Sequence, residues 1–118
     1  MVEVKIPISV GELIDKITIL QIKSKYTNSK FVIKELNDLK EIANTIDYDK
    51  SLEQELYNIN QKLWNVEDAI RLKEKEQNFG LIFIELARDV YFLNDKRAEV
   101  KRQINEETGS LYKEIKCY

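Results

Sequence analysis

The stretch LEQELYNINQKLWNVEDAI, residues 52–70, decides the fold, because its apolar residues recur at spacings of three and four. This spacing places them in one row along a helix, which we call a seam. The seam consists of Leu52, Leu56, Ile59, Leu63, Val66 and Ile70. Ser51 and Gln54 open the stretch with the spacing of a capping box, in which each side chain caps the backbone N–H of the other. We therefore expect a helix from residue 51 to about 76.

A second seam follows the break at Asn78, Phe79 and Gly80. It consists of Phe83, Leu86, Val90, Leu93, Arg97, Val100 and Ile104. Gly109 is suited to end this helix, because glycine readily adopts the left-handed conformation that follows a last helical turn. Each of these two helices would be about 40 Å long. The short break between them predicts an antiparallel helical hairpin.

Two shorter helices are expected before this hairpin. Ser9 and Glu12 have the spacing of a capping box and favour a helix from residue 10 to 26, although ITILQI at 17–22 is strand-like by propensity. Another seam predicts a helix over 30–46. All four repeats are close to 3.5 residues, which is typical of bundles and coiled coils. The predicted fold is therefore mainly α, a four-helix bundle-like set of antiparallel hairpins in one domain, 1–118.

The segments near the two ends of the sequence favour extended structure. Residues 2–8 alternate between apolar residues and polar residues or proline, which is the period of a short strand. Pro7 cannot donate a ladder hydrogen bond, so this strand would be short or at an edge. Residues 111–118 are a candidate for a last strand that pairs with 2–8.

The composition excludes several classes of function. Histidine is absent and Cys117 is the one cysteine, which excludes a Ser-His-Asp or Cys-His nucleophile, an ordinary His/Cys zinc site within the chain and an intrachain disulfide. The 19 Lys and Arg balance 21 Asp and Glu, so there is no basic field for nucleic acid. No apolar run approaches the ~20 residues of a membrane span, and the first residues do not resemble a signal peptide. We expect a soluble cytoplasmic protein without a cofactor or metal site, which binds neither nucleic acid nor membranes.

Arginine is rare and confined to the last two predicted helices, whereas lysine is frequent throughout. Because a guanidinium pairs bidentately with carboxylates and phosphates, these positions are candidates for ligand contacts. Arg97 lies within a seam and should meet a carboxylate of another helix, from Asp68, Asp15 or Glu12. The candidate ligand-binding residues are Arg71, Arg88, Arg97, Arg102, Tyr91, Asp68, Asp95, Asp15 and Trp64. The alternative is that these are solvated ion pairs and, at Arg97, a structural buried pair.

Three segments together resemble a small family of uncharacterised bacterial proteins, a domain of unknown function that also occurs in viruses of marine bacteria. They are IPISVGELIDKITILQIKSK (6–25), LWNVEDAIR (63–71) and FIELARDVYFLNDKRAEVKRQIN (83–105). The resemblance implies a self-standing domain of about this length and carries over no activity or catalytic residue. A weaker likeness links the chain to the helical chorismate mutases, although its first helix has Lys16 and no arginine. Glu85 and Asp89 echo the carboxylate spacing of the all-helical nucleotide pyrophosphatases.

Two functions stay open at this point. Seams on every helix and the lack of catalytic motifs favour a self-associating protein-interaction module, expected as a homo-oligomer, a dimer. The alternative is a protein or enzyme that binds a small anionic metabolite through Arg and carboxylate groups in a pocket between helices. That alternative requires at least two of the four arginines to converge on one pocket. Whether the protein is an enzyme is left open by the sequence.

Overall fold

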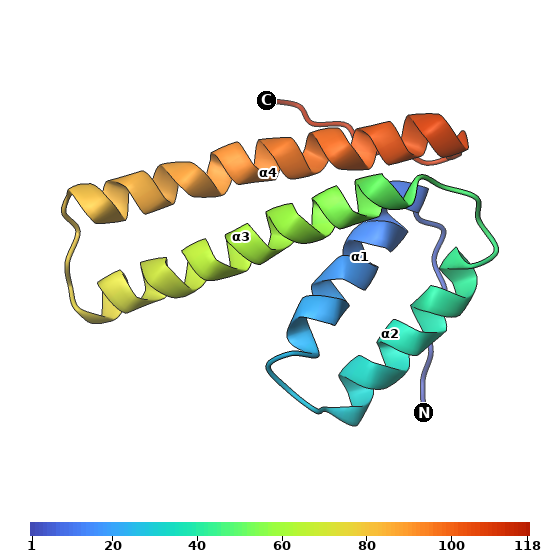
Figure 1. Cartoon of the computed structure of the whole chain (residues 1–118), viewed down its shortest axis with the longest axis horizontal. Helices are drawn as coiled ribbons and strands as arrows, with labels where there is room; N and C mark the ends of the chain where they lie inside the picture. Colours follow the sequence, from blue (N-terminus) through green and yellow to red (C-terminus); the bar gives the residue numbers. More distant parts are fainter.

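The computed structural model describes all of residues 1–118 and contains four α-helices and no strand (Figure 1). The helices are α1 (Val10–Lys23), α2 (Lys30–Ala43), α3 (Lys50–Lys75) and α4 (Leu81–Thr108). The prediction of a mainly helical fold is confirmed. Helix α4 ends at Thr108 and is followed by Gly109, whose φ of 64° is left-handed, as its position in the sequence predicts.

Helices α3 and α4 form a long antiparallel hairpin, and the two shorter helices cover one part of it. Figure 1 shows α1 lying across the half of the hairpin where α3 begins and α4 ends. Helix α1 contacts α2, α3 and α4, whereas α2 packs against α1. The turn that joins α3 to α4, residues 76–80, therefore projects away from the other two helices, and we call it the tip.

The buried apolar core lies entirely in the covered half of the hairpin. It brings together residues of all four helices and Tyr48: Leu13, Ile14, Ile17, Leu20, Leu36, Ala43, Tyr48, Leu56, Ile59, Leu63, Val100 and Ile104. Between Leu63 and Val100 no residue is buried. We call residues 64–99 the outer hairpin. Its two helices contact each other, and α1 reaches them only at the inner end, at Trp64 and Arg97.

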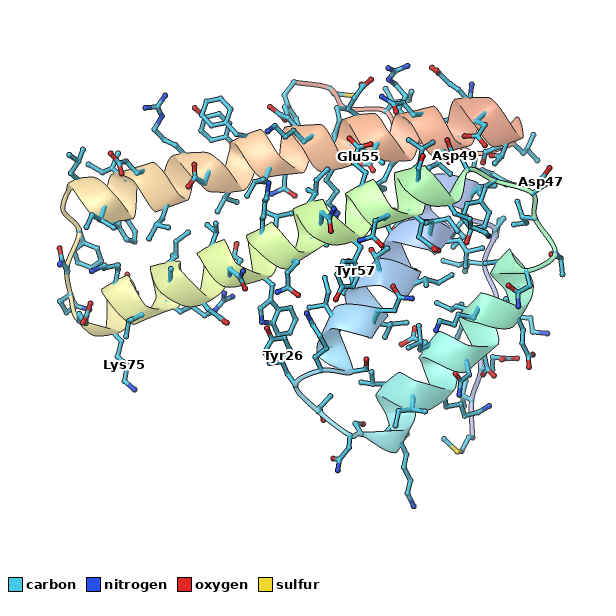
Figure 2. All side chains as sticks on the ribbon, viewed as in Figure 1. Tyr26, Asp47, Asp49, Glu55, Tyr57 and Lys75 are labelled. Atoms are coloured by element: carbon cyan, nitrogen blue, oxygen red, sulfur yellow. The ribbon has the colours of Figure 1, made fainter.

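The outer hairpin exposes large apolar side chains. Seven of them are 47–70% exposed: Leu72, Phe79, Leu81, Ile82, Ile84, Tyr91 and Phe92. Figure 2 shows side chains standing out from both helices as far as Lys75, where α3 reaches the tip. None of the four helices combines the length and the apolar character needed to cross a membrane.

The expected strands are wrong. Residues 2–8 and 111–118 form no ladder, and Figure 1 shows the two termini on different sides of the molecule. Val2, Val4 and Ile6 are exposed. A two-stranded ribbon is marginal in stability, and Pro7 removes one of its donors. The alternation of apolar residues in 2–8 therefore does not produce a strand, because no other strand lies beside it.

One of the two expected capping boxes is present in part and the other is wrong. Ser9 Oγ accepts a hydrogen bond from the Glu12 backbone N–H at 3.0 Å, as predicted. Helix α3 is capped instead by Asp49, whose Oδ1 accepts from the Ser51 N–H at 2.8 Å. Aspartate and serine are equally good N-caps, and the helix begins after Asp49, two residues before the predicted cap at Ser51.

Helices α1 and α2 end three residues before their expected ends. Beyond Lys23 the chain forms a tight turn, in which the Lys25 N–H donates to the Ile22 carbonyl three residues back, at 3.0 Å. The Ile46 N–H likewise donates to the Ala43 carbonyl at 3.0 Å. Apolar periodicity continues through such tight turns, so it does not mark where a helix ends.

Candidate functional site

Helix α1 begins directly against the last turns of α4. The Val10 N–H donates to Ser110 Oγ at 3.1 Å, and the Gly11 N–H donates to Asn105 Oδ1 at 2.6 Å. A Cβ at Gly11 would lie 2.6 Å from the Lys101 carbonyl oxygen, so the close approach requires glycine. Side chains of the chain itself thus occupy these helix N-terminal donors, and the contact fixes where the next turn of α1 meets α4.

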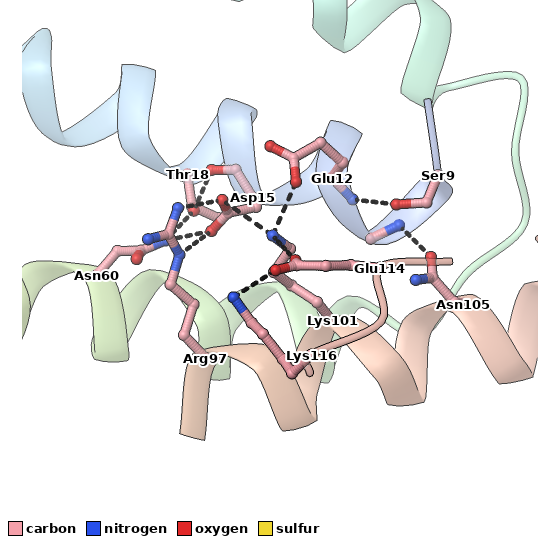
Figure 3. A network of polar contacts seen from close by, with 11 residues as sticks. Ser9, Glu12, Asp15, Thr18, Asn60, Arg97, Lys101, Asn105, Glu114 and Lys116 are labelled. Atoms are coloured by element: carbon pink, nitrogen blue, oxygen red, sulfur yellow. Dashed lines mark hydrogen bonds and ion pairs between the residues drawn. The ribbon is translucent and has the colours of Figure 1, made fainter. Parts of the chain in front are cut away.

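That next turn places the fully buried Asp15 between α1, α3 and α4 (Figure 3). Arg97 binds it through both carboxylate oxygens, with Nε–Oδ1 2.9 Å and Nη2–Oδ2 2.5 Å. Asn60 Nδ2 donates to Asp15 Oδ1 and to Thr18 Oγ1, both at 2.9 Å. Among the three carboxylates expected to meet Arg97, the structure selects Asp15. The hydrogen bonds from Arg97 to Asp15 raise the pKa of Arg97 above its ordinary value.

Lys101 extends this cluster toward the C-terminal segment (Figure 3). Its Nζ lies 2.8 Å from Glu12 Oε2, 3.0 Å from Glu114 Oε2 and 3.9 Å from Asp15 Oδ2. Burial opposes its charge, but hydrogen bonds to Glu12 and Glu114 outweigh burial and raise the pKa of Lys101. Lys116 and then Lys101 lower the pKa of Glu114 to about 2. Glu114 is therefore ionised at neutral pH and ties the last residues to α4.

The charges of this ion network balance one another. The network comprises Asp15, Glu12, Glu114, Arg97, Lys101 and Lys116, three carboxylates and three cations. No buried side-chain nitrogen or oxygen in the chain lacks a hydrogen-bond partner. The chain also has no group of three His, Cys, Asp or Glu arranged to hold a metal ion. The network therefore fixes the position of α1 on the hairpin without requiring a ligand.

A pocket of about 440 Å³ adjoins the network where α1 diverges from α3. We call it the Trp64 pocket. It is lined by Ile19, Ile22, Asn60, Leu63, Trp64, Glu67, Asp68, Arg71 and Arg97. The Trp64 ring stacks on Tyr26, with centroids 4.9 Å apart, and Figure 2 shows Tyr26 just after the end of α1, facing α3. An apolar floor, an indole and two guanidinium groups thus share one concave surface.

The two arginines of the pocket differ in how firmly they are held. Arg71 Nη1 pairs with Glu67 Oε2 at 2.8 Å on the same helix, and its side chain is exposed. The Arg97 side chain is 27% exposed and is bound through two N–H groups to a buried carboxylate. A guanidinium has five N–H donors, so Arg97 keeps three that Asp15 does not use. Asp68, on the rim, forms no ion pair.

A second, larger cavity of about 1140 Å³ lies where residues 113–118 return over α4. It is lined in part by three predicted site residues, Tyr91, Asp95 and Arg102. Arg102 is already paired with Glu99 and with Glu106, the latter at 2.5 Å. The C-terminal segment thus forms a cavity wall instead of the predicted strand.

The nine predicted site residues therefore separate into groups. The Trp64 pocket is lined by Trp64, Asp68, Arg71 and Arg97, and Asp15 binds Arg97 without lining the pocket itself. Tyr91, Asp95 and Arg102 line the second cavity. The Arg88 guanidinium lies 5.7 Å from the centre of the Phe92 ring, among the residues of neither cavity. Arg71 and Arg97 are thus the two of the four arginines that line the Trp64 pocket.

Sequence reasoning missed Asn60 and Thr18, which bind Asp15, and Glu114, which binds Lys101. Asn60 follows Leu56 by four residues and precedes Leu63 by three, so it lies beside the seam and next to the core. A polar residue at such a position signals a buried hydrogen bond. The sequence around Glu114 gives no comparable indication, because the apolar residues of its segment do not recur with the spacing of a helix.

A family model matches residues 4–118, nearly the whole chain, and its description is "Family of unknown function (DUF6165)". No curated protein and no solved structure matches the chain at a significant level. The comparisons therefore bring no activity, ligand or residue role to this site.

Proposed function

The chain belongs to DUF6165, a family of unknown function, and we propose that it is a protein-interaction module that self-associates into a homodimer through the outer hairpin. One observation carries this proposal. Residues 64–99 include no buried residue, although they expose seven large apolar side chains. Exposed apolar surface on this scale is typical of an interaction site.

The lengths of the helices favour a second copy of the chain as the partner. Helix α1, with 14 residues, is about 21 Å long, whereas α4, with 28 residues, is about 42 Å long. About half of the hairpin is therefore left without a covering helix. A second outer hairpin, packed antiparallel on the first, would supply two helices of matching length and complete a four-helix bundle.

The charge and the area of the outer hairpin are also suited to self-association. Residues 64–99 carry six basic and eight acidic side chains, a near balance that favours neither a strongly acidic nor a strongly basic partner. Three of the seven side chains are aromatic and about half exposed; at about 150–250 Å² for a full aromatic side chain they present roughly 300 Å², and the four aliphatic side chains add to this area. Each partner in a standard interface buries about 800 Å².

The dimer predicts different effects for a glutamate introduced at two exposed apolar positions. Ile84→Glu places a charge in the outer hairpin and should shift the protein from dimer to monomer in sedimentation velocity, because the charge would be buried without a partner. Phe31→Glu is the matched control, since Phe31 is 76% exposed but lies in α2, outside the outer hairpin. It should leave the dimer intact. A wild-type protein that stays monomeric at every concentration, or a dimer that only Phe31→Glu dissociates, contradicts the proposal.

A second candidate function is the binding of a small anion in the Trp64 pocket. It is favoured by the presence of Arg71 and Arg97 in one pocket with an apolar floor. Benzoate, which has a ring for the floor and a carboxylate for the guanidinium groups, should then change Trp64 fluorescence in a saturable way. Benzamide is the neutral control and should bind at least about tenfold more weakly, because a charged hydrogen bond is lost. Equal binding of the two compounds, or binding of neither, rules this candidate out.

A further inference from the structure

We infer that the tip of each copy inserts into the Trp64 pocket of the other copy, with Phe79 as the central inserted side chain. The inference rests on the proposed dimer and specifies its contact. It also gives the pocket an occupant from the chain itself.

The position of the pocket along the hairpin leads to this contact. Trp64 lies 11 residues before the end of α3, so the pocket is about 17 Å from the tip. When two outer hairpins pack antiparallel about a twofold axis, the tip of each copy lies next to α1 of the other copy. Ile19 and Ile22 of α1 form the wall at that point, and they line the Trp64 pocket.

The apolar surfaces of the tip and the pocket are complementary. Phe79, Leu81 and Ile82 are exposed at and beside the tip. Phe79 is 48% exposed, and its ring packs edge to face with that of Phe83, with centroids 5.2 Å apart, so part of the Phe79 side chain is open to solvent. The pocket volume of about 440 Å³ exceeds that of one aromatic side chain, so the pocket has room for the ring and for part of the turn.

The charges at the two surfaces are complementary as well. Asp68 on the pocket rim forms no ion pair within its own chain, and neither does Lys75, the last residue of α3. Insertion of the tip would bring Lys75 of one copy to the rim that carries Asp68 of the other. Two such pairs, related by the twofold axis, would fix the antiparallel register of the hairpins.

Intermolecular cross-linking tests this contact directly. In a Cys117→Ser background, the double variant Asp68→Cys and Lys75→Cys should form disulfide-linked dimers under mild oxidation. The two positions are seven residues apart on one helix, about 10 Å, which is too far for a disulfide within one chain. The matched control pairs Asp68→Cys with Lys34→Cys, an exposed lysine of α2, and should cross-link far less.

Trp64 fluorescence gives an independent measurement, because Trp64 is the one tryptophan of the chain. Its emission should shift to the blue as the protein dimerises. Phe79→Ser should abolish this shift and weaken the dimer at least about tenfold, as is usual for a buried interface aromatic. Phe79 is partly exposed in the single chain, so circular dichroism should show an intact helical fold.

The outcomes distinguish this inference from the proposed dimer. A dimer in sedimentation velocity that forms no Asp68–Lys75 cross-link, and whose Trp64 emission equals that of the monomer, overturns tip insertion and leaves the outer-hairpin dimer standing. Absence of any dimer overturns both. Cross-linking together with a Trp64 shift that depends on Phe79 supports both.

Discussion

Replacement of Asp15 by alanine is expected to lower the free energy of unfolding by about 3–5 kcal/mol, the usual loss when one partner of a buried ion pair is removed. The carboxylate is fully buried and accepts hydrogen bonds from Arg97 and Asn60. Without it, the Arg97 guanidinium remains in the helix interface with no negative partner. Because small domains are stable by about 5–15 kcal/mol, this loss is a large share of the total stability. Urea denaturation followed by circular dichroism measures the loss.

Two controls separate charge from shape. Asp15→Asn keeps the size of the side chain and removes the charge, so it should be destabilised by less than the alanine variant. Arg71→Ala removes an arginine whose pair with Glu67 is exposed, and it should change the free energy of unfolding by at most about 1 kcal/mol. If Asp15→Ala and Arg71→Ala prove equally mild, the buried network does not hold α1 on the hairpin.

The helices were predictable from sequence because each has a seam, and a seam depends only on residues close along the chain. Seams place Leu56, Leu63 and Ile104 on the correct faces. They do not report where a helix ends, because the tight turns after Lys23 and Ala43 preserve the apolar period. They also do not distinguish a seam that packs inside the monomer from one that continues into the outer hairpin.

The ion network was predictable in part, for a similar reason. Arg97 interrupts a seam, so a buried partner was required, and Asp15 was among the three carboxylates named. The choice among those three depends on where α1 crosses the hairpin, which Gly11 decides through its close contact with Lys101. That contact joins segments about ninety residues apart, and no local pattern encodes it.

The structure thus divides the α3–α4 hairpin into two halves with different surroundings. In the covered half, α1 fills the groove between the helices, and the ion network fixes its position. In the outer half, α1 reaches only the inner end, where it meets the Trp64 pocket and Arg97, and from there to the tip the two helices continue with no third helix beside them. A chain that places its core at one end of a long hairpin leaves the other end free for contact with a partner.

The isoleucines at the two ends of α4 test this division, since Ile104 is fully buried and Ile84 is 51% exposed. Ile104→Ala should destabilise the protein by about 2–5 kcal/mol at every protein concentration, because it leaves a cavity in the core. Ile84→Ala should have little effect at low concentration, where the monomer dominates, and a growing effect as the concentration rises and the dimer forms. Urea unfolding at two widely separated concentrations measures both. A loss for Ile84→Ala that is equal at the two concentrations would show that Ile84 stabilises the monomer alone, and the outer hairpin would then lose its assigned role in dimerisation.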